Sequence, residues 1–199
     1  MEAKNNLELW NKVEKTNPKY TKKAKVGGMN ITAIAPQYQI MMVTEQFGTY
    51  GKTWGFKNIE LDYSLIEKYD MVVFKGTFFF PEGQFEIINS YKLFINNAKT
   101  MLDDNFAKKI ETDTLTKAIS KLGFNADIFM GKFDDVRYVE EANVHFEKVE
   151  AKKADDRKES LTDTQFEKAK GFTKEQIKTT LNKFRMATDR REELTKLSL

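Results

Sequence analysis

Residues 70–95 of the chain, DMVVFKGTFFFPEGQFEIINSYKLFI, decide the fold. The first part, residues 70–80, is almost entirely apolar and rich in Val and Phe, which favour β-strands. The Pro-Glu-Gly segment at 81–83 predicts a tight turn, and residues 84–95 return as another strand. Partial alternation of apolar and polar residues over 53–64 indicates one more strand before them. Three consecutive strands with short links predict an antiparallel meander.

Helical patterns flank these strands. After them, residues 106–122 carry apolar side chains every three or four positions, which predicts a long helix. Before them we expect helices at 6–15 and 36–47, a basic turn at 19–28 and a short strand at 29–34. The expected fold class is therefore α+β. Its β-β-β-α core is an antiparallel three-stranded β-meander packed on a long helix, with N-terminal helices and a small helical C-terminal appendage.

The composition of the C-terminal part predicts a boundary. Residues 150–160, EAKKADDRKES, contain no apolar side chain larger than Ala and are typical of a charged linker or a helical arm. We expect a core domain at 1–149 and a helical appendage at 161–199. Within the appendage, Thr173 followed by Gln176 matches a capping box at the start of a helix.

The overall composition excludes several classes of site. Hydrophobic residues make up 40% of the chain and charged residues 32%, which is typical of a folded protein. Because there is no cysteine, disulfides and thiolate metal sites are excluded, and the single histidine, His145, excludes sites that need two imidazoles. The start of the chain lacks a signal-peptide pattern, and no run of about 18 apolar residues occurs. We therefore expect a cytoplasmic protein without a membrane partner.

Positive charge is concentrated near the N-terminus. The net charge is only +3, but residues 11–57 contain eight Lys and two acidic residues, Glu14 and Glu45. Such a stretch favours a polyanionic partner. A lysine-rich face that contacts only solvent is the alternative.

Three motifs occur in order along the chain. They are FGTYGKTWGF at 47–56, the end of the meander QFEIINSY at 84–91, and KKIETDTLTKAISKLGF at 108–124. Together they resemble the Rad fifty-two-like single-strand annealing family, most closely its phage Sak-type branch. In that family an FGxxGxxW turn leads into the strands, and a helix of pattern KKxxTDxLxxALxxxG follows them. The resemblance covers roughly residues 5–135, and GFNADIFMGKFDD at 123–135 is also similar to the phage branch.

The resemblance implies a non-enzymatic protein that binds single-stranded DNA and anneals complementary strands in phage homologous recombination. It implies an oligomeric ring or filament in the host cytoplasm, with no ATP, cofactor, metal or catalytic residue. Implied partners are single-stranded DNA and further copies of the chain, with a single-strand binding protein or a phage exonuclease as additional candidates. Such a protein holds the phosphates and leaves the base edges free, so it needs lysines along a groove.

Candidate DNA-contacting residues lie in or near these motifs. The resemblance implies that the long helix and the basic segment before the first strand line the groove. Eukaryotic members carry two adjacent basic residues where this chain has Thr116 and Lys117, so only Lys117 carries over. At about 100° per residue, Lys109, Lys117 and Lys121 lie within about 120° of one another. The candidates are Lys22, Lys23, Lys25, Tyr50, Lys52, Trp54, Lys57, Lys108, Lys109, Lys117 and Lys121.

Several alternatives remain open at this point. Tyr50 and Trp54 are candidates for stacking on bases, although we favour a place in the core for Trp54. Thr112 and Asp113 either position a neighbouring segment or subunit, or face solvent. A second function in the binding class is protection of single strands without annealing. Two further candidate functions lie outside that class. One is a metal-dependent nuclease that uses the pairs Asp103–Asp104 and Asp134–Asp135, and the other is a structural adaptor with solvated lysines.

Overall fold

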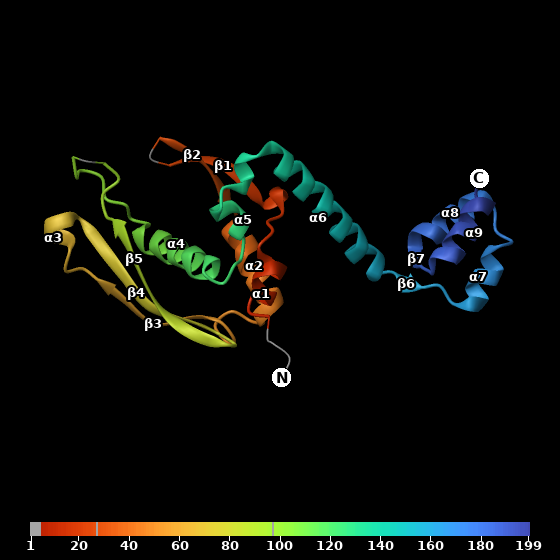
Figure 1. Ribbon diagram of the computed structural model, residues 1–199, viewed down its shortest axis with the longest axis horizontal. Helices are drawn as coiled ribbons and strands as arrows, with labels where there is room; N and C mark the ends of the chain where they lie inside the picture. The colour runs from red at the N-terminus through yellow and green to blue at the C-terminus, as the bar shows by residue number, and fades with distance from the viewer. Residues whose placement is uncertain (1–4, 27, 97) are drawn as a thin grey trace. The chain divides into compact units, whose positions relative to one another are not determined.

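The computed structural model describes residues 5–26, 28–96 and 98–199 and has the predicted α+β fold (Figure 1). The chain divides into two compact units, Met1–Ala142 and Asn143–Leu199. The boundary predicted after residue 149 lies inside helix α6 (Val136–Asp156), which belongs to both units. Within the described ranges, none of the helices has the length and apolar character needed to cross a bilayer.

The first unit is built around a three-stranded antiparallel sheet. Its strands are β3 (Gly55–Asp62), β4 (Met71–Phe80) and β5 (Gly83–Lys92), in the order β3-β4-β5. Strands β4 and β5 pair without interruption from Met71 opposite Lys92 to Phe80 opposite Gly83, and a short helix α3 (Ile66–Tyr69) precedes β4. The predicted meander is confirmed. Its last strand ends at Lys92 rather than at residue 95.

Helix α4 (Phe106–Ser120) lies against one face of this sheet and contacts β4 and β5 (Figure 1). Alternate residues of β4, such as Phe74 and Phe78, point to the same side as α4 and are fully buried. Burying each such ring contributes about 1.5–3 kcal/mol, so this interface supplies much of the stability of the unit. The buried core consists of Val13, Val43, Trp54, Phe74, Phe78, Ile87, Ile110, Ala118, Ile119 and Phe124.

The N-terminal part contains α1 (Glu8–Val13), a 3-10 turn η1 (Pro18–Tyr20) and α2 (Pro36–Phe47). Between them, the segment predicted as a basic turn is instead strand β1 (Thr21–Val26), which pairs antiparallel with β2 (Met29–Ile34). That prediction was wrong because lysines stand on both faces of β1 and hide the alternation that indicates a strand. Gly27 of the predicted turn lies outside the described residues.

A short polar cluster connects the N-terminal segment to residues that follow α4. Buried Asp127, in α5 (Ala126–Phe129), accepts hydrogen bonds from the backbone N–H and the hydroxyl of Thr16, at 2.8 and 2.6 Å. Its carboxylate also accepts one from the Tyr138 hydroxyl at 2.9 Å, beyond the 3-10 turn η2 (Lys132–Asp134). The side chain thus satisfies donors from Thr16, which is 111 residues away in sequence, and from Tyr138, which is 11 residues away.

The second unit has a core of its own, made of Leu161, Phe166, Ala169, Ile177 and Leu194. Its helices are α7 (Asp163–Ala169), α8 (Lys174–Lys183) and α9 (Thr188–Leu197). The two-residue strands β6 (Glu159–Ser160) and β7 (Phe184–Arg185) pair in parallel.

Local signals in this unit are partly those expected from the sequence. The capping box of Thr173 and Gln176 is present at the start of α8. The segment 150–160 is helical as far as Asp156, so the linker alternative is wrong for most of it. Ion pairs join the end of α6 to the rest of the second unit, including Arg185 to Asp156 at 3.0 Å and Arg191 to Asp155 at 3.4 Å.

Gly123 lies in the turn that follows α4, and its substitution tests how tightly the first unit is packed. Its φ is +94°, and a Cβ there would lie 2.7 Å from the ring of Trp10, whereas Gly51 has φ +79° with nothing within 4 Å. Both Gly→Ala changes incur about 1–2 kcal/mol of backbone strain, but only Gly123→Ala adds about 1–3 kcal/mol of overpacking. Urea unfolding will therefore show a larger loss of stability for Gly123→Ala than for Gly51→Ala. Equal losses would contradict the close contact with Trp10.

Candidate nucleic-acid interface

The surface where α4 runs beside β5 carries most of the helix lysines that the sequence singled out. The inward-facing positions of β5 are Phe85, Ile87, Asn89 and Tyr91, so two apolar side chains are followed by two with polar groups. Two lysines of α4 and its C-cap residue, Lys121, lie opposite three of these positions. Lys121 lies over the Phe85 ring at 5.5 Å, Lys117 contacts Asn89, and Lys109 lies near Tyr91 through their shared partner Asp103. We call Lys109, Lys117 and Lys121 the lysine row.

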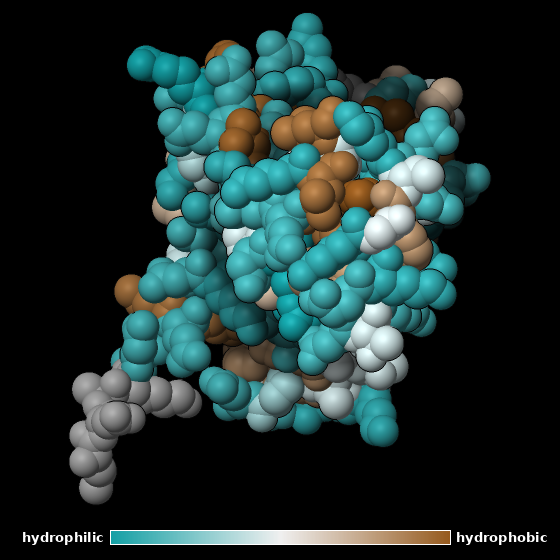
Figure 2. Space-filling view, turned by 90° about the vertical axis from the view of Figure 1, so that its right-hand side faces the viewer, coloured by the Kyte–Doolittle hydropathy of each residue, from teal (hydrophilic) through white to brown (hydrophobic). Residues whose placement is uncertain are grey.

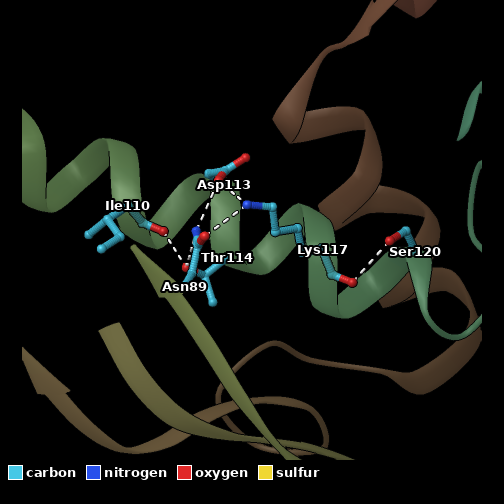
Figure 3. Close-up of polar contacts among 6 residues, drawn as sticks. All are labelled: Asn89, Ile110, Asp113, Thr114, Lys117 and Ser120. Carbon is cyan, nitrogen blue, oxygen red and sulfur yellow. Dashed lines mark hydrogen bonds and ion pairs between the residues drawn. The ribbon is translucent and has the colours of Figure 1, made fainter. Parts of the chain in front are cut away.

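The middle of the row is a hydrogen-bonded network (Figure 3). The amide of Asn89 donates to the Asp113 carboxylate at 2.9 Å and to the Thr114 hydroxyl at 3.0 Å. Lys117 donates to the Asn89 carbonyl oxygen and to Asp113, both at 2.8 Å. Asn89 and Thr114 are buried, and their polar atoms need these partners because water does not reach them. The network fixes how α4 sits along β5, which gives Asp113 a positioning role inside its own chain.

The Asp103 carboxylate is the centre of a second network near the start of the row. It accepts hydrogen bonds from Lys109 and from the Tyr91 hydroxyl, both at 2.7 Å, and its side chain is only 4% exposed. These bonds, first from Lys109 and then from Tyr91, hold the pKa of Asp103 below its ordinary value. Asp103 in turn raises the pKa of Lys109. The charge of Lys109 is therefore balanced within the protein.

An open cleft of ≈ 820 Å³ lies along α4 as far as Thr116. It is lined by Tyr91, Lys108, Lys109, Thr112, Asp113 and Thr116, together with Asn105. Lys108 is exposed and makes no ion pair with a described residue, in contrast to Lys109 and Lys117. We call this hollow the lysine cleft.

The FGTYGKTW motif forms a turn with a structural role. Trp54 is fully buried and donates its ring N–H to the carbonyl of Gly48 at 2.8 Å. Trp54 is therefore in the core, and the prediction that it stacks on a base is not compatible with its burial. Tyr50 packs edge-on against it, with ring centroids 4.8 Å apart, and stays 42% exposed. Burial and the nearby Glu111 carboxylate raise the pKa of Tyr50.

A second, smaller cleft of ≈ 220 Å³ lies on another side of α4. Tyr50 and Gln37 line it, with Ile40 of α2 and the α4 residues Glu111 and Leu115. Thr112 and Thr116 line both this cleft and the lysine cleft, so these two residues form the ridge between them. We call the smaller hollow the tyrosine cleft.

The other predicted lysines lie away from these two clefts. Lys23 of β1 donates to the Thr32 hydroxyl at 2.8 Å and to the Phe133 carbonyl at 3.3 Å. Lys22 and Lys25 are exposed on the same strand, and Lys52 is exposed in the turn after Tyr50. Lys57 lies over the Phe79 ring at 5.9 Å, on the face of the sheet opposite α4. Lys57 is therefore separate from the lysine row.

Sequence reasoning missed several residues of this surface. Asn89 and Tyr91 were not candidates, and Asp103 was considered only as part of a metal-binding pair, although all three set the geometry of the lysine row. A usable signal exists for Asn89 because it is an amide at an inward position of an alternating strand. Buried amides of this kind need partners from the element that covers them. No local pattern indicates Asp103, whose role depends on the path of the loop before α4.

Among the described residues, no three or more His, Asp and Glu side chains are grouped closely enough to hold a metal ion. Figure 2 is drawn from the right-hand side of Figure 1, and the face that it shows is mostly hydrophilic with small hydrophobic patches.

The chain matches no protein-family model, and no curated protein shows significant sequence similarity to it. The chemistry of the two clefts is thus the basis on which a function is inferred.

The Lys109–Asp103 pair gives a direct test of how the lysine row is charged. Lys109→Met removes the strongest donor to Asp103, so the pKa of that carboxyl will rise towards its ordinary value. A carboxyl with a lowered pKa stabilises the fold above its unfolded-state pKa, and this contribution is lost as the pH falls through the folded-state pKa. The variant will consequently lose less stability on acidification. Carbon-13 NMR titration of the carboxyl groups measures the pKa. Lys108→Met is the matched control and leaves the pKa of Asp103 unchanged; equal pKa values for wild type and Lys109→Met would contradict the pairing.

Proposed function

We propose that the chain binds single-stranded DNA through the lysine cleft and the lysine row and anneals complementary strands without ATP, as a homo-oligomer. The observation that carries the proposal is the cleft itself. It is an open hollow of ≈ 820 Å³ with Lys108 and Lys109 on its wall and hydroxyl-bearing Thr112, Thr116 and Tyr91 beside them. The ammonium groups suit phosphate oxygens, which accept hydrogen bonds from them. The hydroxyls of Tyr91, Thr112 and Thr116 already donate within the protein and give the wall a polar, fixed surface.

The charges of this surface favour binding that does not depend on sequence. Lys108 and the three lysines of the row outnumber the two carboxylates paired with them, Asp103 and Asp113. Lysine contacts a phosphate as a point charge, without the bidentate geometry by which arginine reads a base. The chain has no arginine before Arg137. Affinity for DNA should thus come from phosphates and fall steeply with salt.

Two of the lysines bind DNA only at a cost. Lys109 and Lys117 already donate to Asp103 and Asp113 at 2.7 and 2.8 Å, and a phosphate has to compete with these carboxylates. Both lysine side chains remain about half exposed, so the exchange is possible without unfolding α4. Lys108 needs no such exchange. We therefore assign it the largest share of the phosphate affinity among the lysines of α4.

The sheet supports assembly into oligomers. Strands β3 and β5 are its two edges, and among the described residues each pairs with β4 only. An edge strand has unpaired N–H and C=O groups that a strand of another copy can pair with. Ile59 on β3 and Ile88 on β5 are 53% and 69% exposed, which adds apolar surface at both edges. Side-by-side copies would join their lysine clefts and provide the avidity that a single cleft lacks.

The second unit fits a separate role in this proposal. Because it has its own core, it would fold around Leu161, Phe166 and Ile177 whether or not DNA is bound to the first unit. We assign it to contacts with a protein partner, such as a single-strand binding protein or a phage exonuclease. The site of action that follows from this function is the host cytoplasm.

The test is the annealing of two complementary fluorescent oligonucleotides without ATP or Mg²⁺, with light scattering to measure mass. The proposal predicts faster annealing than in protein-free solution and a mass of several chains. Binding without faster annealing would indicate a protective single-strand binding protein instead. Cleavage that appears only with Mg²⁺ would indicate a nuclease, and no binding even at low salt would indicate an adaptor.

Lys108→Ala identifies the surface responsible. It will weaken binding to all single-stranded sequences alike and lower the salt slope by about 1, because one phosphate contact is lost. Lys178→Ala is the matched control, since Lys178 is also an exposed helical lysine but lies in the second unit on α8. If both variants bind DNA as the wild type does, the lysine cleft is not the binding surface.

A further inference from the structure

The tyrosine cleft is not explained by phosphate binding. Its wall combines the apolar side chains of Ile40, Leu115 and Ile119 with hydrogen-bonding groups, and none of the residues that line it is a lysine. The hydrogen-bonding groups come from Gln37, Gln39, Tyr50, Glu111, Thr112 and Thr116, of which Glu111 alone is a charged residue type. A small hollow that combines apolar walls with placed polar groups suits a flat, largely uncharged ligand.

The size of the cleft narrows the choice of ligand. At ≈ 220 Å³ it is smaller than the roughly 300–1,000 Å³ of sites for drug-sized molecules. A single planar heterocycle fits this description better than a whole nucleotide with its phosphate. Gln37 supplies both a donor and an acceptor, and Glu111 supplies an acceptor, which are the groups that pair with the edge of a nucleobase.

Tyr50 is placed for stacking. Trp54 braces it edge-on at 4.8 Å between centroids, and Trp54 is itself fixed by its hydrogen bond to Gly48. An aromatic ring that is held in place and still 42% exposed loses little freedom when a base stacks on it.

The two clefts meet at the ridge formed by Thr112 and Thr116. Thr112 and Thr116 line both, and their hydroxyls donate to the Lys108 carbonyl at 2.8 Å and to Gln39 at 2.9 Å. Gln39 is only 2% exposed, so the second of these contacts is firmly anchored. Short, fixed side chains at the ridge leave room for a strand to keep its phosphate in one cleft and place its base in the other.

We propose that the tyrosine cleft holds one unpaired nucleobase of a strand whose phosphates lie in the lysine cleft. This inference rests on the proposed function and adds a base subsite to it. The captured base is withdrawn from pairing and fixes the strand at one point on each copy of the chain. Its neighbours keep their edges free for a complementary strand.

The experiment compares two probes that have the same number of phosphates. Fluorescence anisotropy with the full chain measures the affinity for an oligothymidylate and for an abasic strand of equal length. The wild type will bind the oligothymidylate about 5-fold or more tightly, because base–aromatic stacking contributes to that complex alone. Tyr50→Ala will lose this preference with an unchanged salt slope, whereas Tyr50→Phe will keep it. Tyr69→Ala is the matched control, because Tyr69 is 49% exposed and lines neither cleft.

A second variant tests the same subsite without changing the turn around Trp54, where Tyr50→Ala could cause a folding defect. Thr112→Leu raises the ridge between the clefts, suits an α-helix and lies outside that turn. It will also reduce the preference for the oligothymidylate. Equal binding of both probes by the wild type would overturn the base subsite while leaving phosphate binding intact. The same conclusion would follow if Tyr50→Ala and Thr112→Leu are both folded and both keep the preference for the oligothymidylate. Failure of the wild type to bind either probe would overturn the proposed function and the base subsite together.

Discussion

Helix α4 packs its apolar residues against one face of the three-stranded sheet and is tied to β5 through Asn89, Asp113 and Lys117. A buried amide left without partners costs about 1–3 kcal/mol, so a shift of α4 along β5 is penalised. This constraint places Thr112 and Thr116 on the ridge and opens one cleft on each side of it. The position of every α4 lysine follows from the same contact.

The networks that hold α4 also limit its electrostatic role. Lys109 and Lys117 are partners of Asp103 and Asp113, so a lysine-rich helix presents less free charge than its sequence indicates. Lys109 and Lys117 thus hold neighbouring side chains in place, whereas Lys108 forms no ion pair with a described residue. Positioning by lysines has a functional benefit in the proposed mechanism, because it keeps the ridge and both clefts in a fixed relation before DNA arrives.

Much of the fold follows from the sequence because periodicity reports directly on burial. The β4–β5 hairpin, α2, α4 and the capping box at Thr173 all have clear patterns, and all are present. Strand β1 was missed because its lysines obscure the alternation, and most of α6 because few of its residues are buried. The site was less predictable. The loop before α4 brings Asp103 beside Lys109, so Lys109 is ion-paired and Lys108 is not. No spacing in the sequence indicates that contact.

The central claim is that a polyanionic strand lies on the first unit along α4. Lysine acetylation followed by mass spectrometry, with and without an oligothymidylate, tests it most directly because each lysine is measured separately. The account predicts that DNA protects Lys108 strongly and the lysine row in part, while Lys57 on the opposite face of the sheet and Lys178 on α8 react as before. Protection confined to residues 143–199, or to Lys57 and its face of the sheet, would contradict it.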